Sequence, residues 1–526
     1  MNFYDHIKTL HNAGLHEDVR LLCSLGNALV HGGEYRKAEV QYKKALQIKK
    51  TLNKGKSKAV SNVESTSEVD VRFKIHECLC HLKQHREAVA VLEGINSKQR
   101  TSKVNMALAK LYQKTGMDRS AVTCFKEVLR ECPLALEAVL GLLSLGVRGA
   151  EVASLVLHGV HGGCEWLSHW IKGHAFIANK EYSHAVSTFK GLDAKVLRNS
   201  TELLCSLGEA HFLNGDYAQA QLALERAHTA EPLMLKNMDT LAYLYAREKK
   251  TKELESLGNQ LMSVSEQAPQ PWVAIGYFCL LTEKRTRAVY FAQKAYTLDN
   301  RCLEALLLKG QGLLELKKNQ DAIMHYREAL RLAPGRYEPY KGIIDCYIAS
   351  HRMREAIQMG SSSIKQLGQN ARSLTLYGSV LAKDQLTLEK AKSVLELALK
   401  FDSLHLDAVY VMADIYTRQQ QWEKGIDMLR NQLQHQSTCR LHQLLGDFLS
   451  QTNEKQEALD QYSIALSLDP GNKQAREGME RVEKNTEVGL ESAYDLEVED
   501  MDGTDNDMDL DGSDVESAWS DVSGYS

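Results

Sequence analysis

Residues 306–334 read LLLKGQGLLELKKNQDAIMHYREALRLAP, two amphipathic segments on either side of a short polar turn. Small, aromatic and proline residues occupy fixed places in this stretch, namely Gly310, Ala322, Tyr326, Ala329 and Pro334. The same residue types return 136 positions later, at Gly446, Ala458, Tyr462, Ala465 and Pro470. Because 136 is four times 34, the pattern predicts a helix–turn–helix unit that repeats every 34 residues.

A 34-residue period with small residues at helix-contact positions is typical of tetratricopeptide repeats (TPR). From residue 166 onward, the predicted repeats start at 166, 201, 235, 269, 303, 337, 371, 406 and 439. Proline stops the second helix of a repeat, and glycine or alanine lets neighbouring helices approach closely. Further packing positions are expected at Gly26, Ala38, Gly208, Ala220, Gly276 and Ala288. The predicted fold is an all-α TPR superhelical solenoid, in which each repeat buries its apolar face against its neighbours.

Five segments are expected along the chain. Residues 1–18 form an N-terminal helix, and residues 19–165 hold less regular N-terminal repeats, interrupted by a flexible loop at 53–67 that lacks large apolar side chains. Residues 166–472 form the regular TPR superhelix. A polar helix at 473–484 caps it, since the last repeat has no following neighbour. Residues 485–526 form a disordered acidic tail.

The charge of the chain is unevenly distributed. The formal net charge is −4, but residues 485–526 contain 14 Asp and Glu and no Lys or Arg, so residues 1–484 carry +10. These positive charges are dispersed, which argues against a nucleic-acid partner. The 11 cysteines have no regular spacing, so we expect a reducing, intracellular environment. No apolar run approaches the roughly 20 residues that would span a membrane.

Signals for catalysis, cofactors or metals are weak. The sequence has no glycine-rich phosphate loop and no His-Glu-x-x-His motif, so neither an enzyme nor a cofactor is expected. Cys78 and Cys80, two apart on a helix, face different directions and do not suit one metal ion. The tail begins a calcium loop at Asp507, but its twelfth position is Ala518 instead of Glu. Ser513, followed by acidic residues, is a candidate phosphorylation site.

A peptide groove is expected along the first helices of the later repeats. TPR modules that clamp chaperone C-termini carry Lys at the fifth and Asn at the ninth position, and no repeat here has that pair. Carboxylates at the ninth position favour a basic or mixed-charge peptide, although an ordinary polar surface explains them equally well. The candidate groove residues are Gln311, Lys341, Asp345, Tyr410, Asp414, Arg418, Arg440, Gln443 and Asp447.

Three blocks resemble a known family: ECPLALEAVLGLLSLGVRGAEVAS (131–154), EALLLKGQGLLELKKNQDAIMHYREALRLAP (304–334) and GDFLSQTNEKQEALDQYSIALSLDP (446–470). They are similar to the subunit-seven family of the anaphase-promoting complex, a mitotic ubiquitin ligase. The resemblance implies a non-catalytic scaffold that forms a homodimer through its N-terminal repeats. It also implies stacking on other TPR subunits, support for coactivator and substrate recruitment, and a location in nucleus and cytoplasm, with spindle association in mitosis.

Two other functions remain open at this point. A TPR co-chaperone or another peptide-binding TPR adaptor would share the same fold, although the missing Lys/Asn pair counts against chaperone tails. An enzyme with an accessory TPR region would need a catalytic domain, and helical repeats are expected to fill residues 19–472.

Overall fold

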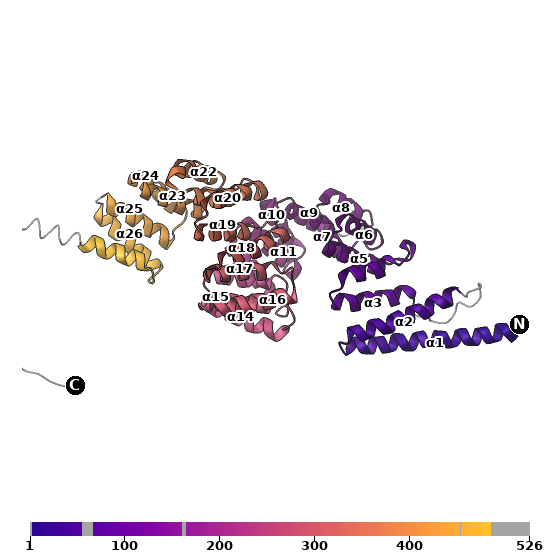
Figure 1. Ribbon diagram of the computed structural model, residues 1–526. Helices are drawn as coiled ribbons and strands as arrows, with labels where there is room; N and C mark the ends of the chain where they lie inside the picture. Colours follow the sequence, from indigo (N-terminus) through magenta and orange to yellow (C-terminus); the bar gives the residue numbers. More distant parts are fainter. Residues whose placement is uncertain (1–2, 55–66, 160–164, 453, 485–526) are drawn as a thin grey trace, which may run out of the picture. The chain divides into compact units, whose positions relative to one another are not determined.

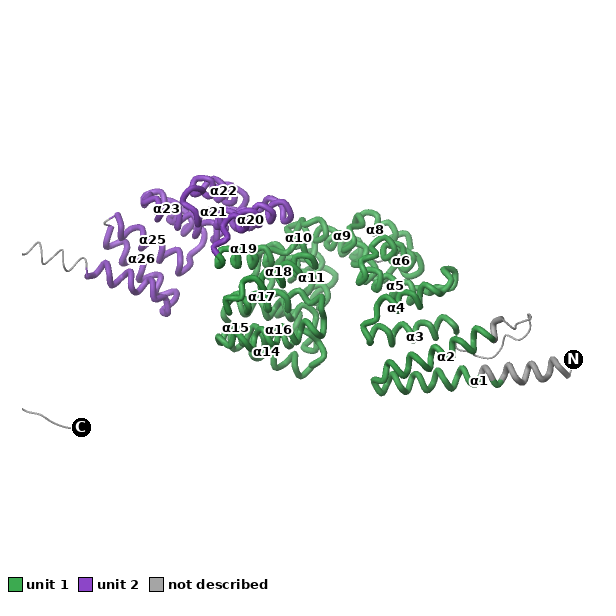
Figure 2. The backbone as a smooth tube through the Cα atoms, in the orientation of Figure 1, with its two compact units in different colours: residues 1–350 green, residues 351–526 purple. Residues whose placement is uncertain are grey.

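The computed structural model describes residues 3–54, 67–159, 165–452 and 454–484. Within these ranges the chain consists of helices and short turns without any strand, as Figure 1 shows. The chain divides into two compact units, residues 1–350 and 351–526 (Figure 2). The expected loop lies almost wholly outside the described residues (55–66), and the acidic tail (485–526), with Ser513 and the calcium-like loop, lies wholly outside them.

Unit 1 is a series of antiparallel helix pairs, each equivalent to one repeat. The first helices of its pairs are α1 (Phe3–His31), α3 (Glu68–His81), α5 (Ser102–Thr115), α7 (Leu136–Ser144), α9 (Glu165–Ala178), α11 (Thr201–Asn214), α13 (Met238–Arg247), α15 (Pro269–Leu281), α17 (Leu303–Glu315) and α19 (Tyr337–Ala349). The second helices are α2 (Tyr35–Lys54), α4 (His85–Glu93), α6 (Asp118–Glu131), α8 (Gly149–Leu157), α10 (Tyr182–Lys195), α12 (Tyr217–Ala230), α14 (Thr251–Val264), α16 (Arg285–Leu298) and α18 (Asn319–Leu332). A 3₁₀ turn, η1 (Ser97–Gln99), follows α4.

Unit 2 continues the same pattern with its own hydrophobic core. Its helices are α20 (Met353–Leu367), α21 (Ala371–Leu381), α22 (Leu388–Phe401), α23 (Leu406–Arg418), α24 (Trp422–Leu433), α25 (Cys439–Gln451) and α26 (Lys455–Leu468), with the 3₁₀ turn η2 (Gln385–Thr387) before α22. Residues 473–484 are also helical, and Ala475 and Val482 are buried in this core.

The predicted repeat period agrees with the observed helices. From residue 165 onward, every first helix begins within three residues of its predicted start. The largest offset is at α13, which begins at Met238 because Asn237 before it takes a left-handed conformation (φ 61°). At the N-terminus, the expected helix 1–18 and the first helix of the first repeat form one continuous α1, since no Gly or Pro lies between Leu15 and Arg20. The all-helical TPR fold is therefore confirmed.

Most of the described inter-helix turns have one left-handed residue at the fifteenth position of the repeat. Lys317 (φ 61°) illustrates it: its own N–H donates to Leu314 O (2.9 Å), and the N–H of Lys318 donates to Leu313 O (2.9 Å). These two bonds form a Schellman motif that ends α17. The same position is left-handed at Gly33, Lys83, Gly116, Lys180, Gly215, Lys249, Glu283, His351 and Gln420. Most of these turns therefore form without glycine.

The expected packing positions lie between helices. A Cβ on Gly310 would come 2.7 Å from Tyr326 Cζ, and one on Gly446 would come 2.8 Å from Tyr462 Cε1. Glycine at these sites lets the first helix lie directly against the aromatic ring of the second. The alanines at the expected contact positions have no exposed surface, and these are Ala38, Ala220, Ala288, Ala322, Ala329, Ala458 and Ala465. Gly26, Gly208 and Gly276 are also buried, whereas Pro334 and Pro470 lie exposed just after α18 and α26.

The first described repeat has an uncovered face on α1. Leu21 and Leu25 occupy the third and seventh positions of this repeat and are 63% and 48% exposed. At the same positions of a later repeat, Leu203 and Leu207 are buried, because the preceding repeat packs on them. The stacking surface that α1 presents is therefore bare within the described chain.

Candidate functional site

The expected groove residues are divided between the two units. In unit 1, Gln311 on α17 and Asp345 on α19 are half-buried, and Lys341 is exposed. In unit 2, the guanidinium of Arg440 on α25 lies over the ring of Tyr410 on α23, 4.2 Å from its centroid. Tyr410 and Arg440 thus form one amphipathic surface from two successive repeats.

Two more of the expected residues pair along α23. Arg418 donates to Asp414 Oδ2 (2.9 Å), four residues earlier, and to the backbone oxygen of Ala382 (2.7 Å). The second bond ties α23 to the end of the preceding first helix. Arg418 therefore links neighbouring repeats while its carboxylate partner remains largely exposed.

Asp447 on α25 is tied to its own repeat. Its carboxylate accepts a hydrogen bond from the hydroxyl of Tyr462 (2.6 Å) and another from Gln443 Nε2 (3.3 Å). Burial raises the pKa of Asp447, and the Tyr462 hydrogen bond opposes that rise. The first repeat has an equivalent bond, in which the Tyr42 hydroxyl donates to Asn27 Oδ1 (2.7 Å). A polar residue at the ninth position thus accepts from the tyrosine fifteen residues later.

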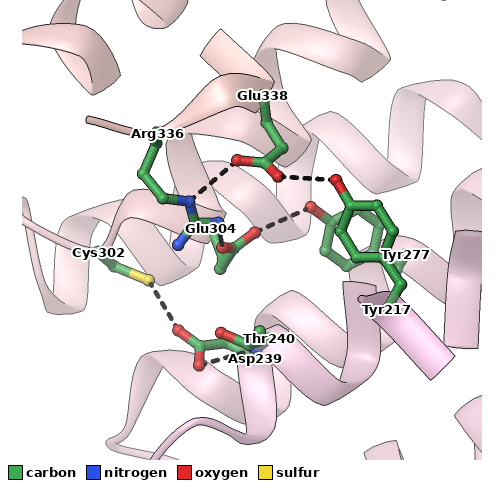
Figure 3. A network of polar contacts seen from close by, with 8 residues as sticks. All are labelled: Tyr217, Asp239, Thr240, Tyr277, Cys302, Glu304, Arg336 and Glu338. Atoms are coloured by element: carbon green, nitrogen blue, oxygen red, sulfur yellow. Dashed lines mark hydrogen bonds and ion pairs between the residues drawn. The ribbon is translucent and has the colours of Figure 1, made fainter. Parts of the chain in front are cut away.

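A buried polar cluster lies elsewhere, around Arg336 in the turn before α19 (Figure 3). Arg336 donates through Nη2 to Glu304 Oε1 (2.6 Å) and through Nε to Glu338 Oε2 (2.9 Å). Its guanidinium also lies over the Phe212 ring of α11, 4.5 Å from the centroid. Glu304 lies in the first turn of α17 and Glu338 in the first turn of α19, so one arginine joins three first helices.

Two tyrosines extend this cluster to further repeats. The Tyr277 hydroxyl of α15 donates to Glu304 Oε2 (3.5 Å), and the Tyr217 hydroxyl of α12 donates to Glu338 Oε1 (3.4 Å). On the other side, the Cys302 thiol donates to Asp239 Oδ2 (3.9 Å), and Asp239 also accepts from the Thr240 N–H. We call these residues the Arg336 network: Tyr217, Asp239, Thr240, Tyr277, Cys302, Glu304, Arg336 and Glu338.

Carboxylates outnumber cations in the Arg336 network. Burial raises the pKa of Glu304 to about 7, although Arg336 opposes the rise. Burial also raises the pKa of Asp239. For Arg336, burial would lower the pKa, but Glu338 and Glu304 outweigh it and raise the pKa overall. The guanidinium of Arg336 therefore stays charged, whereas the buried carboxylates of Glu304 and Asp239 bind a proton more readily than exposed ones do.

Sequence reasoning missed this network. Glu304 and Glu338 stand at the second position of successive repeats, and Arg336 is the last residue before a repeat starts. Most of the expected groove residues stand instead at the fifth and ninth positions. The signal that could have found it is the recurrence of Glu at the second position, at Glu202, Glu304 and Glu338.

No group of three or more His, Cys, Asp or Glu in the described ranges is arranged to hold a metal ion. Cys78 is buried, and the His76 ring nitrogen Nδ1 lies 3.1 Å from the backbone oxygen of Phe73. Among the helices that the structure describes, none is both long and apolar enough to cross a membrane.

Paired helices that repeat every 34 residues define a TPR solenoid. A family model described as tetratricopeptide repeat matches residues 19–52, which is the first repeat predicted above. A solved structure, titled crystal structure of the APC/C hetero-tetramer Cut9-Hcn1, shares the fold with a TM-score of 0.57 and 17% identity. The match covers 88% of this chain and 89% of that one.

The relatives define the family more narrowly. Anaphase-promoting complex subunit 7 from Homo sapiens is 43% identical over 558 aligned positions, which cover 99% of each chain. The protein of the same name from Arabidopsis thaliana is 28% identical over 88% of this chain and 86% of its own. The chain belongs to the anaphase-promoting complex subunit 7 family.

Proposed function

We propose that this protein is a non-catalytic scaffold subunit of the anaphase-promoting complex, a cell-cycle ubiquitin ligase. The observation that carries the proposal is the 43% identity to the human subunit 7 over 99% of both chains. Helix pairs of one kind account for the described chain, which suits a protein whose task is to present surfaces to partners. Ubiquitin transfer would then fall to other subunits, and this one would support recruitment of coactivator and substrate.

Two surfaces suit the partners of such a scaffold. The bare leucines of α1 have the chemistry of a stacking face, and we propose that a second copy covers them in a homodimer. Other TPR subunits would stack along the remaining helices. The amphipathic surface of Tyr410 and Arg440 would take polar segments of a partner or coactivator. No repeat carries the Lys/Asn pair that would favour a co-chaperone.

Affinity purification tests the proposal. The full chain, tagged and expressed in cells of its own source, is purified from mitotic extracts and its companions are identified by mass spectrometry. Other subunits of the anaphase-promoting complex should co-purify in near-stoichiometric amounts. A chaperone-binding TPR protein with the same tag serves as the control. Recovery of the chain without any other subunit would overturn the assignment.

A further inference from the structure

The Arg336 network departs from the usual organisation of solenoids, in which each repeat contacts only its neighbours. Arg336 and Phe212 are separated by four repeats, yet the guanidinium lies on the ring. Tyr217 and Glu338 are 121 residues apart and share a hydrogen bond. With helices packed about 8–10 Å apart, four repeats in a straight stack would separate these side chains by on the order of 40 Å. The segment from α11 to α19 is therefore strongly curved.

The first helices lie on the inside of this curve. α13 contacts α15 and also α17, which belongs to the repeat after next. Helices on the outside of a bend are spread apart, whereas helices on the inside come close together. A contact between α13 and α17, which passes over one repeat, therefore places these first helices on the inner side. The network consequently joins the inner faces of α11, α15, α17 and α19 across the curve.

The contacts of Arg336 have the geometry of a cross-link. The N–H groups of its planar guanidinium bond to the carboxylates of Glu304 and Glu338, which belong to two repeats. The flat face of the guanidinium stacks on the Phe212 ring of a third repeat. The side chains of Arg336, Glu304 and Glu338 are 15%, 3% and 9% exposed, so solvent screens their attraction little. A lysine, a point charge without a flat face, cannot make the same three contacts.

We infer that Arg336 is an electrostatic staple that sets the curvature of residues 201–350, and that this segment opens when the staple is removed. Outside the Arg336 network, Lys83 Nζ also donates to the backbone oxygen of Thr297 (2.9 Å), so a second contact between distant repeats lies near this segment. The staple also fixes which side chains of the inner faces are free to meet a partner. The inference is independent of the partners proposed above, because it concerns the isolated chain.

Distance measurement by double electron–electron resonance tests the staple. Spin-labelled non-canonical residues replace Gln219 on α12 and Lys341 on α19, both exposed, because the native cysteines exclude thiol labels. The full chain should give one narrow distance distribution. Arg336→Met should shift it to longer distances and broaden it, and the α19 amides should exchange hydrogen at least about tenfold faster. Arg331→Met, an exposed arginine on α18, is the matched control and should change neither.

Chemical rescue separates a staple from simple packing. In Arg336→Ala, added ethylguanidinium should restore the narrow distribution, whereas ethylammonium should not, because only the planar cation can bridge both carboxylates. If Arg336→Met loses helical content, Glu338→Gln makes the same test. This variant keeps the ion pair between Arg336 and Glu304 and weakens only the contact between Arg336 and residue 338 of α19. An unchanged distribution in a folded Arg336 variant overturns the inference, and so does rescue by neither cation.

Discussion

Glu304 shows how strongly the fold controls a single charge. It lies at the start of α17, almost fully buried, with Arg336 on one carboxylate oxygen and Tyr277 on the other. Burial raises its pKa from 4.5 to about 7 in spite of the arginine. The folded chain thus holds a proton on Glu304 over a pH range in which the unfolded chain does not.

The pH dependence of stability should reveal this proton. Because the folded pKa is raised, the contribution of Glu304 to the free energy of unfolding is present at low pH and is lost as the pH rises through 7. Between about pH 6 and pH 8, the native protein should lose about 1 kcal/mol more stability than Glu304→Gln. Urea unfolding followed by circular dichroism measures the difference. The two proteins differ only at residue 304, so equal pH profiles would contradict the raised pKa.

Tyr462 offers a second test at the residue scale. Its buried hydroxyl donates to the carboxylate of Asp447, and Tyr462→Phe would leave that oxygen without this donor. We expect a loss of about 1–3 kcal/mol in the free energy of unfolding of the C-terminal repeats. Tyr290→Phe is the control, because Tyr290 is 63% exposed and its change should stay within about 0.5 kcal/mol. Equal stabilities of the two variants would show that the bond adds nothing.

The first residues of the helices recur with the 34-residue period, so the helix starts could be predicted from the sequence. The period placed the starts of α17 and α25 at the observed residues because Gly310 and Gly446 fix the helix contacts. The turns were predicted less completely, since left-handed residues are usually recognised as glycine and Lys317 gives no such signal. The recurrence of Glu at the second position marks Glu304 and Glu338, but the meeting of Arg336 with Phe212 in the Arg336 network could not be predicted. It depends on curvature summed over four repeats, and no local spacing encodes that curvature.

The strained turns give a prediction for one element. A left-handed conformation costs a residue with a Cβ roughly 1–2 kcal/mol, and Lys317 adopts it at φ 61°. Lys317→Gly should therefore raise the free energy of unfolding by about 1 kcal/mol, after the greater flexibility of glycine in the unfolded chain is subtracted.

Its neighbour is a matched control. Lys318 has a φ of −89°, so Lys318→Gly removes no strain and should lower stability by about 0.5–1 kcal/mol. Thermal melting of both variants beside the native protein compares them directly. A lower melting temperature for Lys317→Gly would contradict the strain argument.

The molecule is an array of repeats, and the first described repeat exposes Leu21 and Leu25 on α1. The proposed homodimer depends on Leu21 and Leu25, and replacing both by Glu should convert a dimer to a monomer. Burying the two leucines is worth roughly 3 kcal/mol or more, so Kd should rise more than about a hundredfold. Sedimentation velocity measures the change. Leu222→Glu is the control, because Leu222 is 53% exposed on α12 and lies away from α1 along the array.

The bare face of α1 also bears on stoichiometry. If two copies bury their Leu21 and Leu25 against each other, the same patch on both partners is used up in a two-fold contact. A contact of this kind closes on itself, whereas joining unlike patches would leave a free patch on every added copy and produce a fibre. TPR repeats could in principle keep stacking on further copies. A two-fold contact through Leu21 and Leu25 would instead limit the assembly to two copies of the chain.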